Sequence, residues 1–138
     1  MTARWMLSIL ILAGCGAAPQ ASEEAAALYY PRHDAPYGQG DMAGFEGSLM
    51  FREGCLWLDL AGGPTFLPIW PSDTKPGVIN SLPVVLMDDD LLVVETGETR
   101  NFAGSQIDPV SVEELVGPIP ERCAGNSFWA VTRVDRLP

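Results

Sequence analysis

Two runs of alternating apolar and polar residues near the middle of the chain predict a β-hairpin. The first run, residues 47–52, places Leu49 and Phe51 on one face of a strand, and the second, residues 55–60, places its three leucines together. A short glycine-containing turn at residues 53–54 separates them, which is typical of a hairpin. We therefore expect β structure from this point of the chain onward.

Three more apolar runs continue the β pattern. Residues 65–70 predict a third strand, which Pro68 restricts to a sheet edge or a bulge because proline has no amide hydrogen. Residues 82–87 and 91–96 flank an acidic turn, so they predict a second hairpin.

The last third of the chain predicts a strand, a short helix and a closing strand. Residues 97–107 are expected to form a short strand with a bend. Ser111 and Glu114 have the spacing of a capping box, which predicts a helix that ends at Gly117. Residues 127–134 predict the closing strand.

These elements predict one mainly β domain over residues 44–138, with about six short strands and one short helix before the last strand. Residues 71–77 are expected to form a loop. Small all-β chains close into barrels or sandwiches, which removes exposed strand edges. We expect a small closed or partly open barrel, similar in topology to OB-like and SH3-like barrels.

The amino-terminal segment, residues 1–14, has the three parts of a secretory signal. Arg4 precedes an apolar run that is shorter than the roughly 20 residues needed to span a bilayer. Leu12-Ala13-Gly14-Cys15 then resembles the lipobox of bacterial lipoproteins. The resemblance implies that the Cys15 thiol receives a diacylglyceryl group and that a peptidase cuts between Gly14 and Cys15.

The same resemblance implies the location of the protein. Two acyl chains hold a protein stably at a membrane surface, so the lipid anchor makes the membrane a partner. Gly16 follows the lipidated cysteine, where aspartate would resemble an inner-membrane retention signal. This favours the outer membrane if the host has one, and otherwise the outer face of the plasma membrane. The alternative is an ordinary secreted protein that is cut near Gly16-Ala17-Ala18.

Residues 15–43 are expected to form the lipidated cysteine and a flexible tether. The stretch is rich in small residues, and Pro31 and Pro36 interrupt any regular element. His33, the single histidine of the sequence, lies in this tether. A general base must be held within reach of its target, so His33 is a poor catalytic candidate.

The three cysteines of the sequence also fit an exported lipoprotein. If Cys15 carries lipid, Cys55 and Cys123 remain as a pair, and exported proteins keep such pairs oxidised. A disulfide between them closes a long loop and stabilises the fold by about 4 kcal/mol in the chain-entropy model. The alternative is a reactive or metal-binding thiol pair, for which CxxC spacing and a nearby histidine are missing.

The formal net charge of the chain is −10, and the signal segment contributes only Arg4 to it. An acidic surface repels phosphate backbones, so the composition argues against nucleic acid as a partner. An envelope protein or a glycan is the expected partner, and the oligomeric state stays open.

Two groups of residues are candidates for ligand contacts. Trp57, Trp70 and Trp129 all fall on predicted strands, and together they would form a stacking platform for sugars or peptides, although packing in the core is the alternative. Asp88, Asp89 and Asp90 are a weak candidate for a calcium site, because the spacing of an EF-hand is absent and aspartate is common in turns. No cofactor is expected.

Three short motifs resemble those of uncharacterised small exported bacterial domains. They are Gly54-Cys55-Leu56, Pro68-Ile69-Trp70-Pro71 and Cys123. The resemblance implies no known activity. The sequence thus favours a lipid-anchored, non-enzymatic binding or structural module of the cell envelope. The alternatives are a hydrolase that uses two carboxylates as acid and base, and a calcium-binding module.

Overall fold

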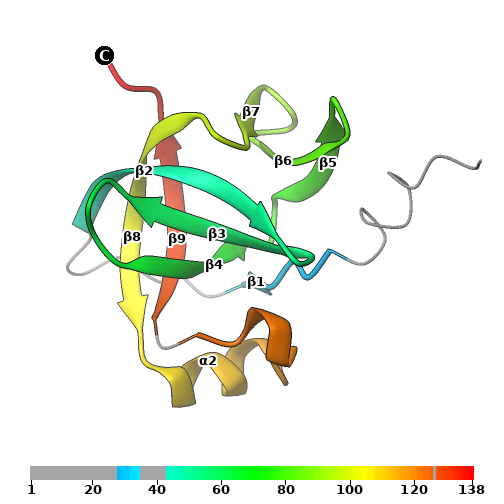
Figure 1. The fold of residues 1–138 in the computed structure, drawn as a ribbon, viewed down its shortest axis with the longest axis vertical. Helices are drawn as coiled ribbons and strands as arrows, with labels where there is room; N and C mark the ends of the chain where they lie inside the picture. The colour runs from blue at the N-terminus through cyan, green and yellow to red at the C-terminus, as the bar shows by residue number, and fades with distance from the viewer. Residues whose placement is uncertain (1–27, 35–42, 126) are drawn as a thin grey trace, which may run out of the picture.

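The computed structural model describes residues 28–34, 43–125 and 127–138, and this part of the chain is mainly β. It contains nine strands, one α-helix and one short 3-10 helix (Figure 1). The strands are β1 (Arg32–His33), β2 (Ala43–Arg52), β3 (Cys55–Leu60), β4 (Thr65–Pro71), β5 (Lys75–Ile79), β6 (Leu82–Met87), β7 (Leu92–Glu95), β8 (Thr99–Ile107) and β9 (Phe128–Asp135). The helices are α2 (Pro109–Val116) and η1 (Glu121–Cys123).

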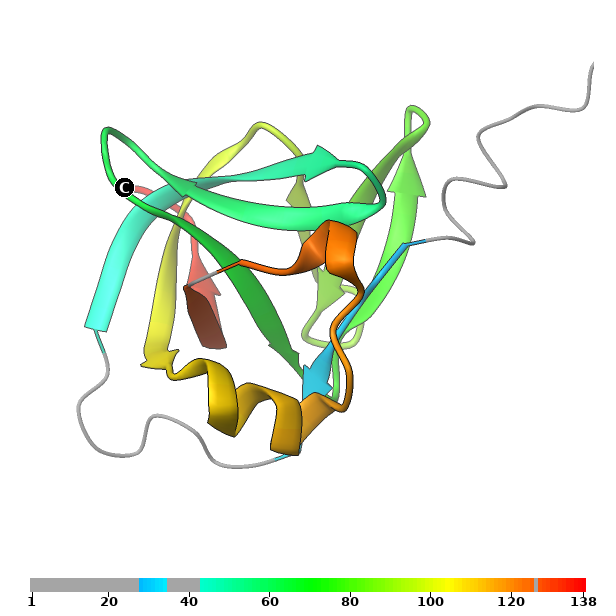
Figure 2. The ribbon, with the colours of Figure 1, turned by 60° about the horizontal axis from the view of Figure 1, so that its bottom comes forward.

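Five of the strands pair in a closed ring. β2 pairs with β3 and β8, β4 pairs with β3 and β9, and the β8–β9 pair completes the circle. The β4–β9 pair is parallel and the other four are antiparallel. Figures 1 and 2 show these strands curving around one interior.

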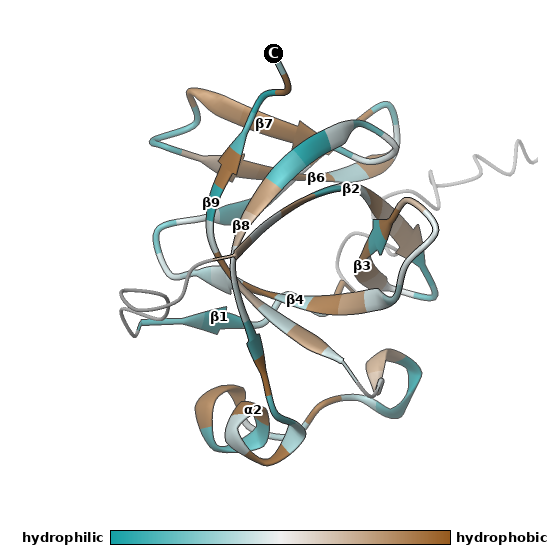
Figure 3. Cartoon of the chain, turned by 90° about the vertical axis from the view of Figure 1, so that its left-hand side faces the viewer, coloured by the Kyte–Doolittle hydropathy of each residue, from teal (hydrophilic) through white to brown (hydrophobic). Residues whose placement is uncertain are grey.

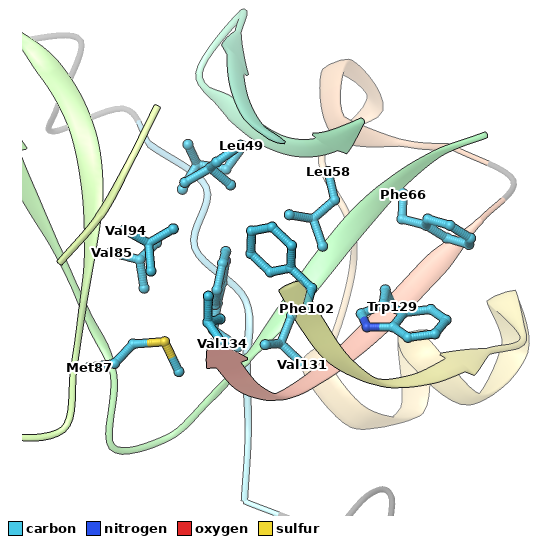
Figure 4. Packing of buried hydrophobic residues seen from close by; sticks show 12 residues of the cluster. Leu49, Leu58, Phe66, Val85, Met87, Val94, Phe102, Trp129, Val131 and Val134 are labelled. Carbon is cyan, nitrogen blue, oxygen red and sulfur yellow. The ribbon is translucent and has the colours of Figure 1, made fainter. Parts of the chain in front are cut away.

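A separate three-stranded sheet of order β5-β6-β7 lies at one end of the ring, and α2 lies at the other (Figure 3). Val85, Met87 and Val94 point from this sheet toward the interior of the ring (Figure 4). The small sheet therefore covers an end of the ring with apolar side chains, which adds to the buried apolar area that stabilises the fold.

The ring interior is packed with apolar side chains. Leu49, Leu58, Phe102 and Val131 have no exposed surface, and Trp129 lies beside Phe66 in the same cluster (Figure 4). Leu49 and Leu58 pair directly in the β2–β3 register, so the first predicted hairpin and its buried face are confirmed.

Residues 28–34 belong to the folded body, although they fall in the expected tether of residues 15–43. β1 pairs in parallel with β4, and the Trp70 amide donates a hydrogen bond to the Pro31 carbonyl at 2.9 Å. A strand of two residues has no periodicity that a sequence can show, which explains the difference. Residues 1–27 and 35–42, with the signal segment and the rest of the expected tether, lie outside the described residues.

β4 changes partners along its length, and Pro68 lies at the change. On one side, β4 pairs with β3 at Thr65 and Phe66 and with β1 at Trp70 and Pro71. The amide of a residue at position 68 would point to this side, between the two pairings, so the missing amide hydrogen of proline leaves no bond unmade.

The structure has nine strands, more than the total of about six that was expected. β1 lies in the expected tether, and β5 begins in the expected loop of residues 71–77. β5 contains Pro76 and Gly77, which disfavour strands, but its pairing with β6 over five residues overrides this local preference.

The helix before the last strand is confirmed, but it begins earlier than the capping box predicts. Its N-cap is Asp108, whose carboxylate accepts hydrogen bonds from the Ser111 amide at 3.0 Å and the Ser111 hydroxyl at 2.6 Å. Pro109 follows as the first helical residue, where proline is favoured. The helix ends at Gly117 as predicted, with a φ of 77°.

The predicted disulfide between Cys55 and Cys123 is present, with a Cα–Cα distance of 5.7 Å. It connects the start of β3 to η1 and closes a loop of 68 residues. Both cysteines are buried in a second apolar cluster with Val112 of α2 and Phe128 of β9. The crosslink therefore ties the first hairpin to the segment that leads into the closing strand.

Candidate functional site

The three tryptophans do not form a common platform. Trp70 has no exposed surface and Trp129 is 6 % exposed, and both belong to the core cluster inside the ring. Trp57 is half-buried on the outer side of β3. The proposed stacking platform is therefore wrong for Trp70 and Trp129, and Trp57 alone stays accessible.

Trp57 lines a surface hollow beside the disulfide, which we call the disulfide hollow. Its other lining residues are Arg52, Glu53 and Arg122, and its volume is about 280 Å³. Two guanidinium groups, one carboxylate and one indole ring thus meet at a single place on the surface.

The β2–β3 hairpin sets the geometry of Arg52 and Trp57. Arg52 pairs with Cys55 and Met50 pairs with Trp57, so Arg52 and Trp57 are diagonal neighbours across the hairpin. The Arg52 guanidinium carbon lies 5.6 Å from the centre of the Trp57 ring, which is a cation–π contact. Gly125 also lies against this ring, since a Cβ atom added there would be 3.4 Å from Trp57 Cζ3.

The disulfide brings Arg122 to the same hollow. Arg122 lies in η1 directly before Cys123, and the Cys123 amide donates to the Pro120 carbonyl at 2.8 Å. The Cys55–Cys123 bond holds this turn against the hairpin. The disulfide therefore brings two arginines that are distant in sequence to the same hollow.

The chemistry of the disulfide hollow favours binding of an anionic group. Guanidinium groups stay protonated in proteins and donate in a planar fork that matches carboxylate or phosphate oxygens. The contact with Trp57 restricts the motion of the Arg52 side chain, which lowers the conformational entropy lost on binding. Arginine enriched beside an exposed aromatic ring is also typical of protein-binding surfaces.

Asp88, Asp89 and Asp90 form the turn between β6 and β7. All three are exposed with positive φ values of 50°, 53° and 69°, and Asp90 makes an ion pair with Lys75 at 3.0 Å. Within residues 28–34, 43–125 and 127–138, no group of three or more His, Cys, Asp or Glu side chains is placed to hold a metal ion. The calcium site considered for these aspartates is therefore not formed, and the aspartates serve the turn.

His33 is buried rather than placed on a flexible tether. Its Nε2 donates a hydrogen bond to the Val131 carbonyl at 3.0 Å, which connects β1 to β9. No local pattern predicts this contact, because it joins His33 to a residue near the other end of the chain.

Sequence reasoning missed both arginines of the disulfide hollow, although a signal was present. Arg122 adjoins Cys123, and Arg52 lies three residues before Cys55. The predicted disulfide therefore already implied that these two cations lie near each other.

Gly14 and Cys15, the predicted cleavage and lipidation residues, lie outside the described residues. No helix in the part of the chain that the structure describes has the length and hydropathy needed to cross a membrane. Comparisons of this chain with protein-family models, curated proteins and solved structures give no match.

Proposed function

We propose that this protein is a lipid-anchored bacterial envelope protein that acts as a non-enzymatic binding module. The disulfide hollow is the binding surface, and the ligand is an anionic group of an envelope protein or glycan. The observation that carries the proposal is the meeting of Arg52 and Arg122 around Trp57 in one hollow.

The residues of the hollow support binding rather than catalysis. An arginine side chain does not exchange its proton near neutral pH, so Arg52 and Arg122 supply charge and hydrogen bonds but no acid or base. A hydrolase of the two-carboxylate type needs a pair of carboxylates at a fixed spacing. The lining of the hollow contributes one carboxylate, that of Glu53.

The anchor and the location rest on residues 12–15, which match a lipobox. The disulfide supports an oxidising compartment outside the cytoplasm, since such bonds are rare in reducing cytosol. The anchored domain would stand on the outer membrane of a two-membrane host, or on the outer face of the plasma membrane. We further propose that the closed ring of five strands is a small barrel of OB-like or SH3-like type, because its pairings leave the ring without a free edge.

Replacement of Cys15 by Ser tests the anchor. The variant should appear in the soluble fraction or keep its leader, while the wild-type chain stays with the membrane. Mass spectrometry of the mature amino terminus should show a diacylglyceryl mass on Cys15. Unchanged membrane attachment of Cys15→Ser would overturn the anchor.

Site-specific photocrosslinking in intact cells tests the binding surface. A photoreactive residue at Glu53, which lines the disulfide hollow, should give a defined adduct that the Arg52→Gln/Arg122→Gln double variant loses. The matched double variant Lys75→Gln/Arg133→Gln changes the net charge equally but lies elsewhere, so it should keep the adduct. Loss of the adduct in both double variants, or in neither, would refute the disulfide hollow as the binding surface.

A further inference from the structure

A second hollow, which we call the ring-end hollow, lies where β8 begins and β9 ends. Its lining residues are Glu98, Thr99, Arg100, Arg136 and Leu137, and its volume is about 410 Å³. In Figure 1 this part of the ring lies at the top, next to β7 and the carboxyl-terminal residues. It contains none of the residues of the disulfide hollow.

Arg100 is the unusual residue of the ring-end hollow, because it is charged and only 5 % exposed. Its Nη2 donates to Glu98 Oε1 at 2.8 Å and to the Val93 carbonyl at 3.2 Å. Its Nε and Nη1 are buried and have no hydrogen-bond partner among the described residues. A buried charged donor without a partner is costly, so such groups in native proteins call for an explanation.

Arg136 adds a second positive charge at the same end of the ring. β8 and β9 pair at Phe102–Val134 and Asn101–Asp135, and Arg136, which follows the last paired residue of β9, lines the hollow together with Arg100. Two like charges close together repel each other, which costs stability unless an anion lies between them. On the other side Arg100 pairs with Gly47 of β2, which has no side chain that could accept a hydrogen bond from the guanidinium group.

We propose that the ring-end hollow binds a small oxyanion, a phosphate or a carboxylate group. Nε and Nη2 lie on the same edge of the Arg100 guanidinium, so they offer a fork to two oxygens of the anion once Glu98 leaves Nη2, and Arg136 supplies the second cation. Glu98 is an internal competitor, because its carboxylate already occupies Nη2. Its side chain is 42 % exposed, so it can move into water when the ligand anion arrives.

The test follows the Arg100 Nε–H signal by NMR during titration of the full domain with inorganic phosphate and, separately, with acetate. We expect a saturable shift of this signal. Saturation by phosphate alone assigns a tetrahedral oxyanion, and saturation by acetate as well assigns a carboxylate; either result supports the site.

Two charge variants decide whether the residues act as proposed. Glu98→Gln removes the competitor and should tighten binding about tenfold, while Arg136→Gln should weaken it about tenfold, as expected for one charged hydrogen bond. Glu95→Gln and Arg133→Gln make the same charge changes on β7 and β9 outside the hollow, and they should leave the affinity unchanged. These variants avoid Arg100, whose loss would also remove its bond to β7.

Three results would overturn the proposal. They are the lack of a saturable Arg100 shift with both anions, equal effects of Arg133→Gln and Arg136→Gln, and unchanged or weaker binding by Glu98→Gln. The disulfide hollow is not part of this test, so the outcome is independent of the proposed function.

Discussion

The ring of Tyr30 stacks on the ring of Trp70, with centroids 5.9 Å apart and planes within 4° of parallel. Trp70 is fully buried, and the Tyr30 hydroxyl shares a hydrogen bond of 2.8 Å with Thr74 Oγ1. Together with the His33–Val131 hydrogen bond, this stack attaches residues 28–34 to the ring. The attachment therefore combines an aromatic stack with hydrogen bonds. Because the Tyr30 hydroxyl can lose its proton, the stability of this attachment should depend on pH.

We expect the stability of the protein to fall in alkaline solution because of Tyr30. Burial raises the pKa of the Tyr30 phenol above its ordinary value of 10.0, while the Thr74 hydrogen bond and Arg32 oppose the shift. The unfolded chain thus loses this proton at a lower pH than the folded chain. The stabilisation is complete below pH 10.0 and is lost as the pH rises toward the folded pKa.

Urea unfolding of Tyr30→Phe, from neutral pH to about pH 11, checks this. The variant keeps the stack and loses the hydroxyl, so it should be less stable by about 1 kcal/mol at neutral pH. Its alkaline decline should be shallower than that of the wild type. Parallel pH profiles for the two proteins would show that Tyr30 is not responsible.

Cys123→Ala should lower the free energy of unfolding by about 4 kcal/mol, because the unfolded chain regains the entropy of a long loop. Thermal unfolding measures the loss. Labelling of free thiols should find Cys55 and Cys123 unreactive in the native oxidised protein. An unchanged melting temperature would mean that the crosslink does not stabilise the fold.

Gly104→Ala should destabilise the protein by about 3 kcal/mol. Gly104 lies at the irregularity in the β8–β9 register, and a Cβ atom there would collide with the carbonyl of Ala130. Gly44→Ala is the matched control in β2, since its Cβ would approach only the side chain of Asn101, at 3.0 Å. Chemical denaturation should show a clearly smaller loss for Gly44→Ala, and equal losses would contradict the collision.

Asp108 should make the amino terminus of α2 sensitive to acid. Hydrogen bonds from the Ser111 hydroxyl and amide hold the pKa of this carboxyl below its ordinary value of 3.8. The stabilisation is present above pH 3.8 and is lost as the pH falls through the folded pKa. The protection factors of the α2 amides, which compare each exchange rate with that of an unfolded chain at the same pH, should therefore fall in acid for the wild type.

Asp108→Asn and Asp108→Ala separate charge from capping. Asparagine is also a good N-cap, so Asp108→Asn should keep high protection factors in α2, and these should no longer depend on acid. Asp108→Ala should exchange faster at every pH. If both variants behaved like the wild type, capping by Asp108 would not stabilise the amino terminus of α2.

The sequence predicted the elements whose signals are local. Leu56 and Leu58 are buried as the alternation of their strand predicts, and Gly117 ends α2. It did not predict features that depend on distant partners. Ile69 and Trp70 point to opposite faces of β4, yet both are fully buried, because Trp70 belongs to the core cluster and Ile69 to the second apolar cluster, which contains the disulfide. Alternation cannot show a strand that is covered on both faces.

The candidate sites show the same division. The diagonal placement of Arg52 and Trp57 follows from the predicted hairpin, because the turn fixes the register. The hydrogen bond of Arg100 to the Val93 carbonyl and the nearness of Arg136 depend on how β8 meets β7 and β9. These contacts between strands form only when the chain folds, and no local sequence pattern predicts them.

Pro68 shows how a residue without an amide hydrogen suits a strand that changes its hydrogen-bonding partner along its length. Any other residue at that position would carry an amide hydrogen into the buried gap between the β3 and β1 pairings, where removing it from water is costly. Proline interrupts most sheets, but here it is compatible with a strand, β4, that pairs with β1, β3 and β9. An exchange to valine, the usual choice for a strand, would improve the local propensity and harm the junction.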